Sequence, residues 1–129
     1  MLVVDTNVVV RYLVNDEPAQ AARARRLFAQ HDVFVPLTVM LESEWVLRGV
    51  FGLPAADVVR GLRALAGLAR VTLQNPSAVA AALDWAERGL DFADALHLAA
   101  AQQHAGFVTF DKALVRMARR LDTPTVREP

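Results

Sequence analysis

The chain has 129 residues, 54% of them hydrophobic, and its 14 basic residues balance 14 acidic ones. We find no internal repeat, low-complexity tract or linker, so residues 1–129 are expected to form one compact domain. No apolar stretch is long enough to cross a bilayer, and no basic segment followed by an apolar one resembles a secretory signal. We therefore expect a soluble, cytoplasmic protein with no membrane partner.

Short apolar runs alternate with helical patterns along the chain. Strands are expected over 2–5, 33–36, 71–74 and 107–110, with a last one near 125–126. The periodicity and the capping residues predict helices over 6–14, 18–30, 38–48, 54–68, 76–89, 91–105 and 111–121. Unbroken apolar runs of this length suit parallel strands covered on both faces. The sequence thus predicts an α/β sandwich with a mainly parallel central sheet flanked by helices.

Two aspartates follow expected strands directly. Asp5 closes the run Leu2-Val3-Val4, and Asp111 follows the run 107–110. Open α/β sheets bind ligands in the crevice beyond the carboxyl ends of their strands. Both aspartates are therefore candidate functional residues, although a lone aspartate there is often only a turn or cap residue.

A glutamate lies in the middle of the third expected helix, which should begin at the cap residue Thr38. At about 100° per residue, Glu42 shares an arc with apolar residues such as Val46. Glu44 lies about 200° round the same helix and precedes Arg48 by four residues, an order that favours a surface ion pair. Glu42 is thus expected to face a site and Glu44 to face solvent.

A fourth acid, Asp94, shares its helix face with Leu98 and Ala101. Asp91 opens the same helix and suits the N-cap position. His97 follows Asp94 by three residues and is therefore a candidate acid or base if catalysis is metal-free. The alternative is a helical histidine with a structural hydrogen bond.

Convergence of the acids would explain why carboxylates stand among apolar segments. Burying one isolated carboxylate is costly, whereas several can share a cation. Oxygen ligands select Mg²⁺ or Mn²⁺ over zinc, and the chain has no cysteine. We therefore expect Asp5, Glu42, Asp94 and Asp111 to act as metal ligands and catalytic residues.

The motifs that carry these acids resemble those of one family. They are Leu2-Val3-Val4-Asp5-Thr6-Asn7, then 41–48 (LESEWVLR), 91–97 (DFADALH) and 109–111 (TFD). In this order they resemble the PIN-domain ribonucleases, and more closely the VapC-type toxins of bacterial type II toxin–antitoxin systems. The resemblance extends over essentially the whole chain and places Asp5, Glu42, Asp94 and Asp111 on the family's four acidic positions.

The resemblance also implies a fold, an activity and partners. Thr6 and Asn7 match the polar pair after the first acid, as auxiliary site residues. The implied fold is a three-layer PIN-like sandwich formed by a single PIN domain over residues 1–129. The implied activity is Mg²⁺- or Mn²⁺-dependent endoribonuclease cleavage, of tRNA or rRNA, by a homodimer that a VapB-like antitoxin neutralises.

Two other functional classes remain open from the sequence. One is a catalytically silent PIN-like module that binds RNA or protein. The other is a phosphatase or phosphoacceptor domain with Asp5 as nucleophile, although such domains commonly carry a second aspartate where this chain has Asn7. Thirteen of the 14 basic residues are arginine, and local clusters such as 23–26 suit phosphate binding or are ordinary solvated helix faces.

Overall fold

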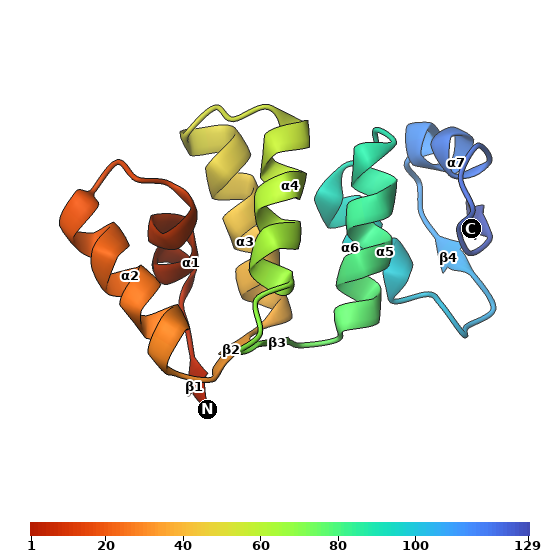
Figure 1. Ribbon diagram of the computed structural model, residues 1–129. Helices are drawn as coiled ribbons and strands as arrows, with labels where there is room; N and C mark the ends of the chain where they lie inside the picture. The colour runs from red at the N-terminus through yellow and green to blue at the C-terminus, as the bar shows by residue number, and fades with distance from the viewer. The chain divides into compact units, whose positions relative to one another are not determined.

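A computed structural model describes all 129 residues as helices joined by short loops, with five short strands. The chain divides into two compact units, Met1–Pro76 and Ser77–Pro129, and each is described separately. Figure 1 shows helices as the main component of both units. None of these helices combines the length and apolar character needed to cross a bilayer.

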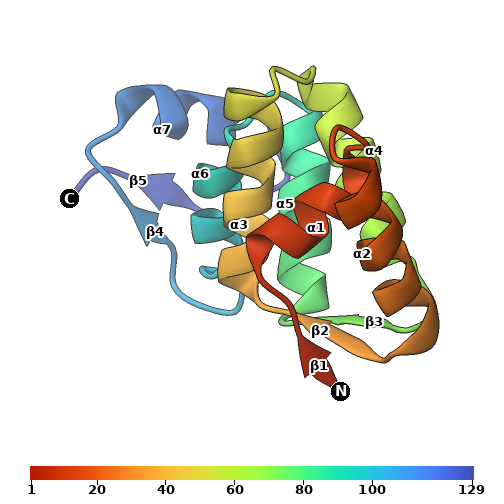
Figure 2. The same ribbon diagram turned by 90° about the vertical axis from the view of Figure 1, so that its left-hand side faces the viewer.

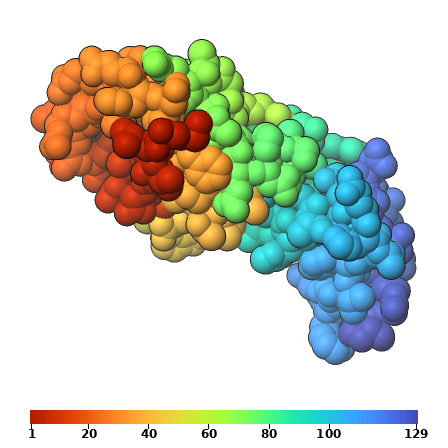
Figure 3. Space-filling view, turned by 90° about the horizontal axis from the view of Figure 1, so that it is seen from below, coloured from red at the N-terminus to blue at the C-terminus, as the bar shows by residue number.

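The N-terminal unit is organised by a three-stranded parallel sheet. Its strands are β1 (Leu2–Val3), β2 (Val33–Val35) and β3 (Val71–Leu73), in the order β1-β2-β3. The register pairs Leu2 with Val33, and Val33 with Val71. In the space-filling view the red N-terminal segment lies beside the orange chain that contains β2 (Figure 3).

Four helices and one π-helical turn complete this unit. They are α1 (Thr6–Leu13), α2 (Pro18–Gln30), α3 (Leu37–Trp45), the π turn η1 (Val46–Val50) and α4 (Ala55–Ala66). α1 packs against α2 and α3, and α3 against α4 (Figure 2). The apolar faces of these helices and the central strand form the core. Its fully buried members include Val9, Val33, Val35, Met40, Leu47, Val58, Leu62 and Leu65.

The C-terminal unit contains three helices and a two-stranded parallel sheet. Its elements are α5 (Pro76–Glu87), α6 (Phe92–Ala99), β4 (Phe107–Val108), α7 (Lys112–Ala118) and β5 (Val126–Arg127). β4 pairs in parallel with β5. The indole N–H of Trp85 donates to the Asp122 carbonyl at 3.2 Å, and Arg88 donates to the Arg120 carbonyl at 3.1 Å. These bonds attach α5 to the segment that follows α7.

The predicted order of strands and helices is confirmed, and all strand pairs are parallel. The α/β fold class is therefore correct. The helix expected over 91–105 is shorter and ends at Ala99. That residues 1–129 form a single PIN domain stays a prediction, since the chain separates into two compact units.

The prediction that Thr38 caps the third helix is wrong. α3 begins one residue earlier, with Pro36 at the N-cap position. The side-chain carbonyl of Gln74 accepts the N–H of Leu37 at 2.9 Å and so satisfies one of the free donors of the first turn. A cap supplied from 37 positions away along the chain leaves no local signal in the sequence.

We predict that Gly106→Ala destabilises the protein by about 1–3 kcal/mol. Gly106 has a φ of +157°, and an added Cβ would lie 3.0 Å from the Thr125 carbonyl oxygen, which accepts the N–H of Phe107. The matched control is Gly61→Ala within α4, where the new Cβ would meet Leu13 at an ordinary 3.7 Å. That change should stabilise by about 0.5–1 kcal/mol. Equal unfolding midpoints for the two variants in urea would contradict this account.

Candidate active site

Asp5 stands at the junction of β1 and α1. Its backbone caps α1, and its Oδ1 accepts the N–H of Thr6 at 2.7 Å. The carboxylate is exposed although the residue before it, Val4, is buried. The helix N-terminus also favours a negative charge at this position. Asp5 is thus held in place by local backbone geometry while its other carboxylate oxygen stays available.

Thr6 connects Asp5 to Glu42 across 36 positions of sequence. The threonine is buried, and its hydroxyl donates a short hydrogen bond to Oε1 of Glu42. This contact holds the glutamate beside the start of α1. The resemblance predicted Thr6 and Glu42 as site residues, and the structure brings them together with Asp5 in one unit.

These three residues line a pocket of about 370 Å³. Asn7 and Arg11 of α1 extend its polar side. The remaining lining is apolar and consists of Val10, Val46, Val50 and Phe51. The pocket therefore combines two carboxylates, the guanidinium of Arg11 and an apolar wall.

The apolar wall of the pocket depends on the π turn η1. The N–H of Phe51 donates to the Val46 carbonyl at 3.1 Å, five residues back. A turn of this kind is rare and often occurs at functional sites. The sequence interpretation missed Val50, Phe51 and Arg11 as pocket residues. Only Arg11 had a local signal, because it follows Asn7 by four residues on α1.

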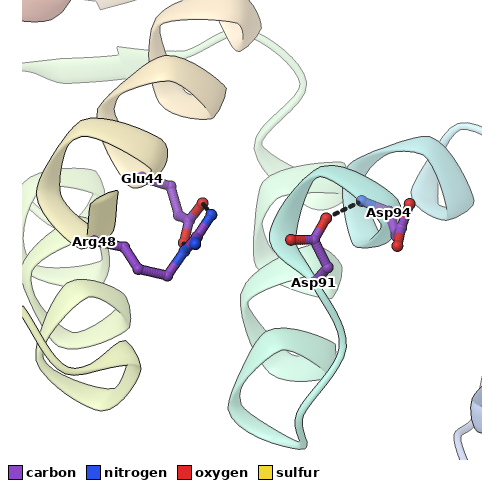
Figure 4. Close-up of polar contacts among 4 residues, drawn as sticks. All are labelled: Glu44, Arg48, Asp91 and Asp94. Atoms are coloured by element: carbon purple, nitrogen blue, oxygen red, sulfur yellow. Dashed lines mark hydrogen bonds and ion pairs between the residues drawn. The ribbon is translucent and has the colours of Figure 1, made fainter. Parts of the chain in front are cut away.

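The expected orientation of Glu44 is wrong. Glu44 is buried, with 7% of its surface exposed, and shares this face with Met40, Ser43 and Leu47. Its carboxylate does pair with Arg48, at 2.8 Å, as the spacing predicted (Figure 4). Glu42 lies on the exposed side of the helix. Apolar residues lie on several sides of this helix, so their periodicity predicted the wrong buried face. The prediction that the two glutamates point in different directions is correct.

The C-terminal unit holds the other two acids of the motif set. Asp111 caps α7, and its Oδ1 accepts the N–H of Leu114 at 3.1 Å. Asp91 caps α6, and its Oδ2 accepts the N–H of Asp94 at 3.1 Å (Figure 4). The N-cap role expected for Asp91 is confirmed. Asp94 itself lies in the first turn of α6 and is partly buried.

The carboxylate of Asp94 has a raised pKa. Burial is the largest cause, followed by the negative charges of Asp91 and Asp111, while His97 acts in the opposite direction. Like charges within interaction range make ionisation less favourable. This unit therefore concentrates negative charge that a bound cation would offset.

Both units offer oxygen donors suited to a hard cation. The N-terminal unit contributes the carboxylates of Asp5 and Glu42, and the C-terminal unit those of Asp94 and Asp111. Neither unit alone gathers three potential ligands closely enough to hold a metal. The donor chemistry fits Mg²⁺ or Mn²⁺, because carboxylate oxygens are their preferred protein ligands.

Comparison with known proteins identifies the family. The sequence profile of the PIN domain matches residues 2–120, which is most of the chain. The chain belongs to the PIN domain family. Among solved structures, it is similar to VapC20 from Mycobacterium tuberculosis, a toxin described as cleaving the sarcin–ricin loop. The two share 21% identity over 88% of this chain and 92% of VapC20, with a TM-score of 0.45. Curated protein sequences gave no match.

We predict that Glu42→Gln abolishes nuclease activity with little change in stability. The side chain is exposed, and glutamine can still accept the Thr6 hydroxyl, so only the charge is lost. The matched control, Glu44→Gln, should keep the activity but lower stability by about 1 kcal/mol through its weakened pair with Arg48. RNA cleavage and urea unfolding test both variants. Activity lost only in the Glu44 variant would contradict this assignment.

We also predict a pH-dependent stability gain for Asp94→Asn in EDTA. Because the folded-state pKa of Asp94 lies above its usual 3.8, the folded protein binds this proton more tightly than the unfolded chain does. Wild-type stability contributed by this group is thus fully present below pH 3.8 and is lost as pH rises through the raised pKa. Asp94→Asn should exceed wild type at pH 7, and the difference should shrink in mild acid. Urea midpoints from pH 3.5 to 7 measure it.

Asp91→Asn provides a graded comparison. Asparagine caps helices as well as aspartate does, so the variant removes the charge beside Asp94 and keeps the cap. Asp91→Asn should also be more stable than wild type at pH 7, and this gain should be smaller than that of Asp94→Asn. The reason is that burial raises the pKa of Asp94 more than the charge of Asp91 does. A pH-independent difference between wild type and Asp94→Asn would show that the carboxylate is not perturbed.

Proposed function

We propose that this PIN domain is a metal-dependent endoribonuclease of the VapC toxin type. The observation that carries the proposal is the Asp5–Thr6–Glu42 cluster, in which two motif acids are held at one pocket by a buried threonine. Two carboxylates fixed in this way provide the start of a cation site. In the proposal Asp94 and Asp111 complete the ligand set with Asp5 and Glu42.

The reaction adds water across one P–O bond of RNA and leaves a phosphate monoester and a free hydroxyl. A bound Mg²⁺ or Mn²⁺ supplies Lewis-acid chemistry, which activates the water and offsets charge on the phosphate. Asp5 and Glu42 hold their carboxylates ready through contacts that the protein already makes. The exposed carboxamide of Asn7 offers a donor to a phosphate oxygen.

The pocket and the charge balance favour RNA that is already folded. The net charge is zero, so long-range attraction to nucleic acid is weak and recognition depends on local contacts. The wall formed by Val46, Val50 and Phe51 suits an unstacked base next to the cleaved bond. Loops of tRNA or ribosomal RNA supply such bases. We propose these as the substrate class.

The remaining features of the proposal follow from the toxin type. They are a homodimer, a VapB-like antitoxin that covers the acidic pocket, and activity in the cytoplasm. Such a pocket attracts a basic side chain, since a guanidinium would replace the cation between the carboxylates.

The second candidate is a catalytically silent PIN module, which would bind RNA without cutting it. All four motif acids are present, which argues against this candidate. A module that only binds RNA gains nothing from the repulsion between negative charges that raises the pKa of Asp94. The phosphoacceptor alternative is disfavoured for a different reason. Asp5 Oδ1 serves the cap of α1, and residue 7 is asparagine, so no second aspartate follows to assist.

The purified protein should cleave transcribed tRNA or rRNA hairpins with Mg²⁺ or Mn²⁺ and not with EDTA, because the proposed mechanism needs the cation to activate water and to offset charge on the phosphate. Mg²⁺ should also raise the melting temperature of wild type by binding the folded state. Asp5→Asn keeps the cap but should lose cleavage and this Mg²⁺ response. Asp57→Asn on α4 outside the pocket, where Asp57 pairs with Arg60, is the control and should keep both. Undiminished cleavage in EDTA would overturn the metal mechanism and favour His97.

A further inference from the structure

A larger cavity adjoins the acidic pocket and has the opposite charge. It encloses about 630 Å³ between α1 and α2, and no acidic residue lines it. Its polar lining consists of Asn7, Arg11, Gln20 and Arg23, over an apolar floor of Val8, Ala24 and Leu27. Asn7 and Arg11 line both cavities, so the two spaces meet along α1.

Arg11 is already positioned to bind an anion. Its Nε donates to Oε1 of Gln20 at 2.8 Å, and its Nη1 contacts Oδ1 of Asp16 at 3.4 Å. These contacts fix the guanidinium plane and leave Nη2 without a protein partner. Because the side chain is held in place, less conformational freedom is lost when an anion binds.

Arg23 and Asn7 contribute groups that have no partner in the protein. Both residues are exposed, and neither the guanidinium nor the carboxamide makes a hydrogen bond or ion pair. Since Asp16 offsets the charge of Arg11 in part, Arg23 is the uncompensated cation of the cavity. A planar guanidinium in this position matches two oxygens of a phosphate.

We propose that this cavity binds an RNA phosphate adjacent to the one being cleaved. The inference rests on the proposed function and specifies its substrate contact. Along α1 the order is Asp5 at the cap, Asn7 in the first turn, and Arg11 one turn further. A strand whose cleaved phosphate lies at the acids therefore continues along α1, and its next phosphate reaches Arg11 and Arg23. Arg23 acts as a positioning residue that selects a continuing RNA strand over a terminal phosphate.

The test compares two arginines of the same helix. Arg23→Gln removes the uncompensated cation of the cavity. Arg25→Gln makes the same charge change about 200° round α2, and Arg25 lines neither cavity. Both residues are exposed, so both variants should fold, as melting curves will verify. The probe is a fluorescein-labelled RNA hairpin of mixed sequence in EDTA, where binding is measured by anisotropy without cleavage.

Arg23→Gln should weaken binding about tenfold at low salt and reduce the slope of log Kd against log salt by about one. Arg25→Gln should change binding less than about twofold and leave that slope unaltered. Equal effects of the two variants would overturn the cavity as a subsite and leave only general attraction. If Arg23→Gln matches wild type while wild type cleaves RNA with Mg²⁺, the subsite is wrong and the nuclease function stands.

A chemical change in the substrate gives the second measurement. Once the cleaved bond is mapped, each neighbouring linkage is replaced in turn by a neutral methylphosphonate on a 2′-deoxy sugar, with a 2′-deoxy phosphodiester as reference. At one neighbour, the neutral linkage should lower kcat/KM for wild type about tenfold and have little further effect in Arg23→Gln. If the neutral linkage lowered kcat/KM of wild type and of Arg23→Gln by the same factor at both neighbouring positions, the proposed contact would be overturned. If wild type cleaves nothing but the Arg23-specific salt slope persists, the nuclease function fails and the phosphate site stands.

Discussion

Placement of carboxylates at the starts of helices is the constraint on which the rest of the site depends. Asp5, Asp91 and Asp111 each cap a helix through a bond to a backbone N–H. A capping carboxylate is favoured by the helix dipole, so its position is fixed by folding and needs no ligand. The opposing cost falls on Asp94, which burial and two neighbouring negative charges make harder to ionise. The capping bonds of Asp91 and Asp111 are favourable in themselves, and they hold two negative charges near Asp94 that raise its pKa.

The connection between Thr6 and Glu42 illustrates what the sequence revealed and what it did not. Short apolar runs followed by an aspartate predicted Asp5 and Asp111 as strand-end residues. The alternation of such runs with helical patterns was enough to predict a parallel α/β fold. The partner of Thr6 was not predictable in the same way, because a contact across 36 positions depends on how α1 packs against α3. Apolar residues surround the helix of Glu42, and their periodicity therefore did not identify the buried face.

In the proposal, the larger cavity gives a protein of zero net charge a local site for a polyanionic substrate. Asp16 and Gln20 hold Arg11, and Arg23 lies on the next helix of the same cavity. The net charge gave no sign of this arrangement, because it averages the acidic pocket with its basic neighbour, whereas the arginine cluster 23–26 was a local sign of phosphate binding. Local separation of charge along one helix is sufficient for recognition at short range.

The π turn η1 has a consequence for how this protein can diverge. Because this turn contains one residue more than an α-helical turn, loss of a single codon within Val46–Val50 would leave a regular helix. Everything after the deletion would rotate by about 100° and shift by about 1.5 Å relative to Glu42. Val50 and Phe51 would then leave the pocket wall, while Asp5 and Glu42 would keep their positions. One deletion can therefore remodel the apolar wall of the pocket without moving Asp5 or Glu42.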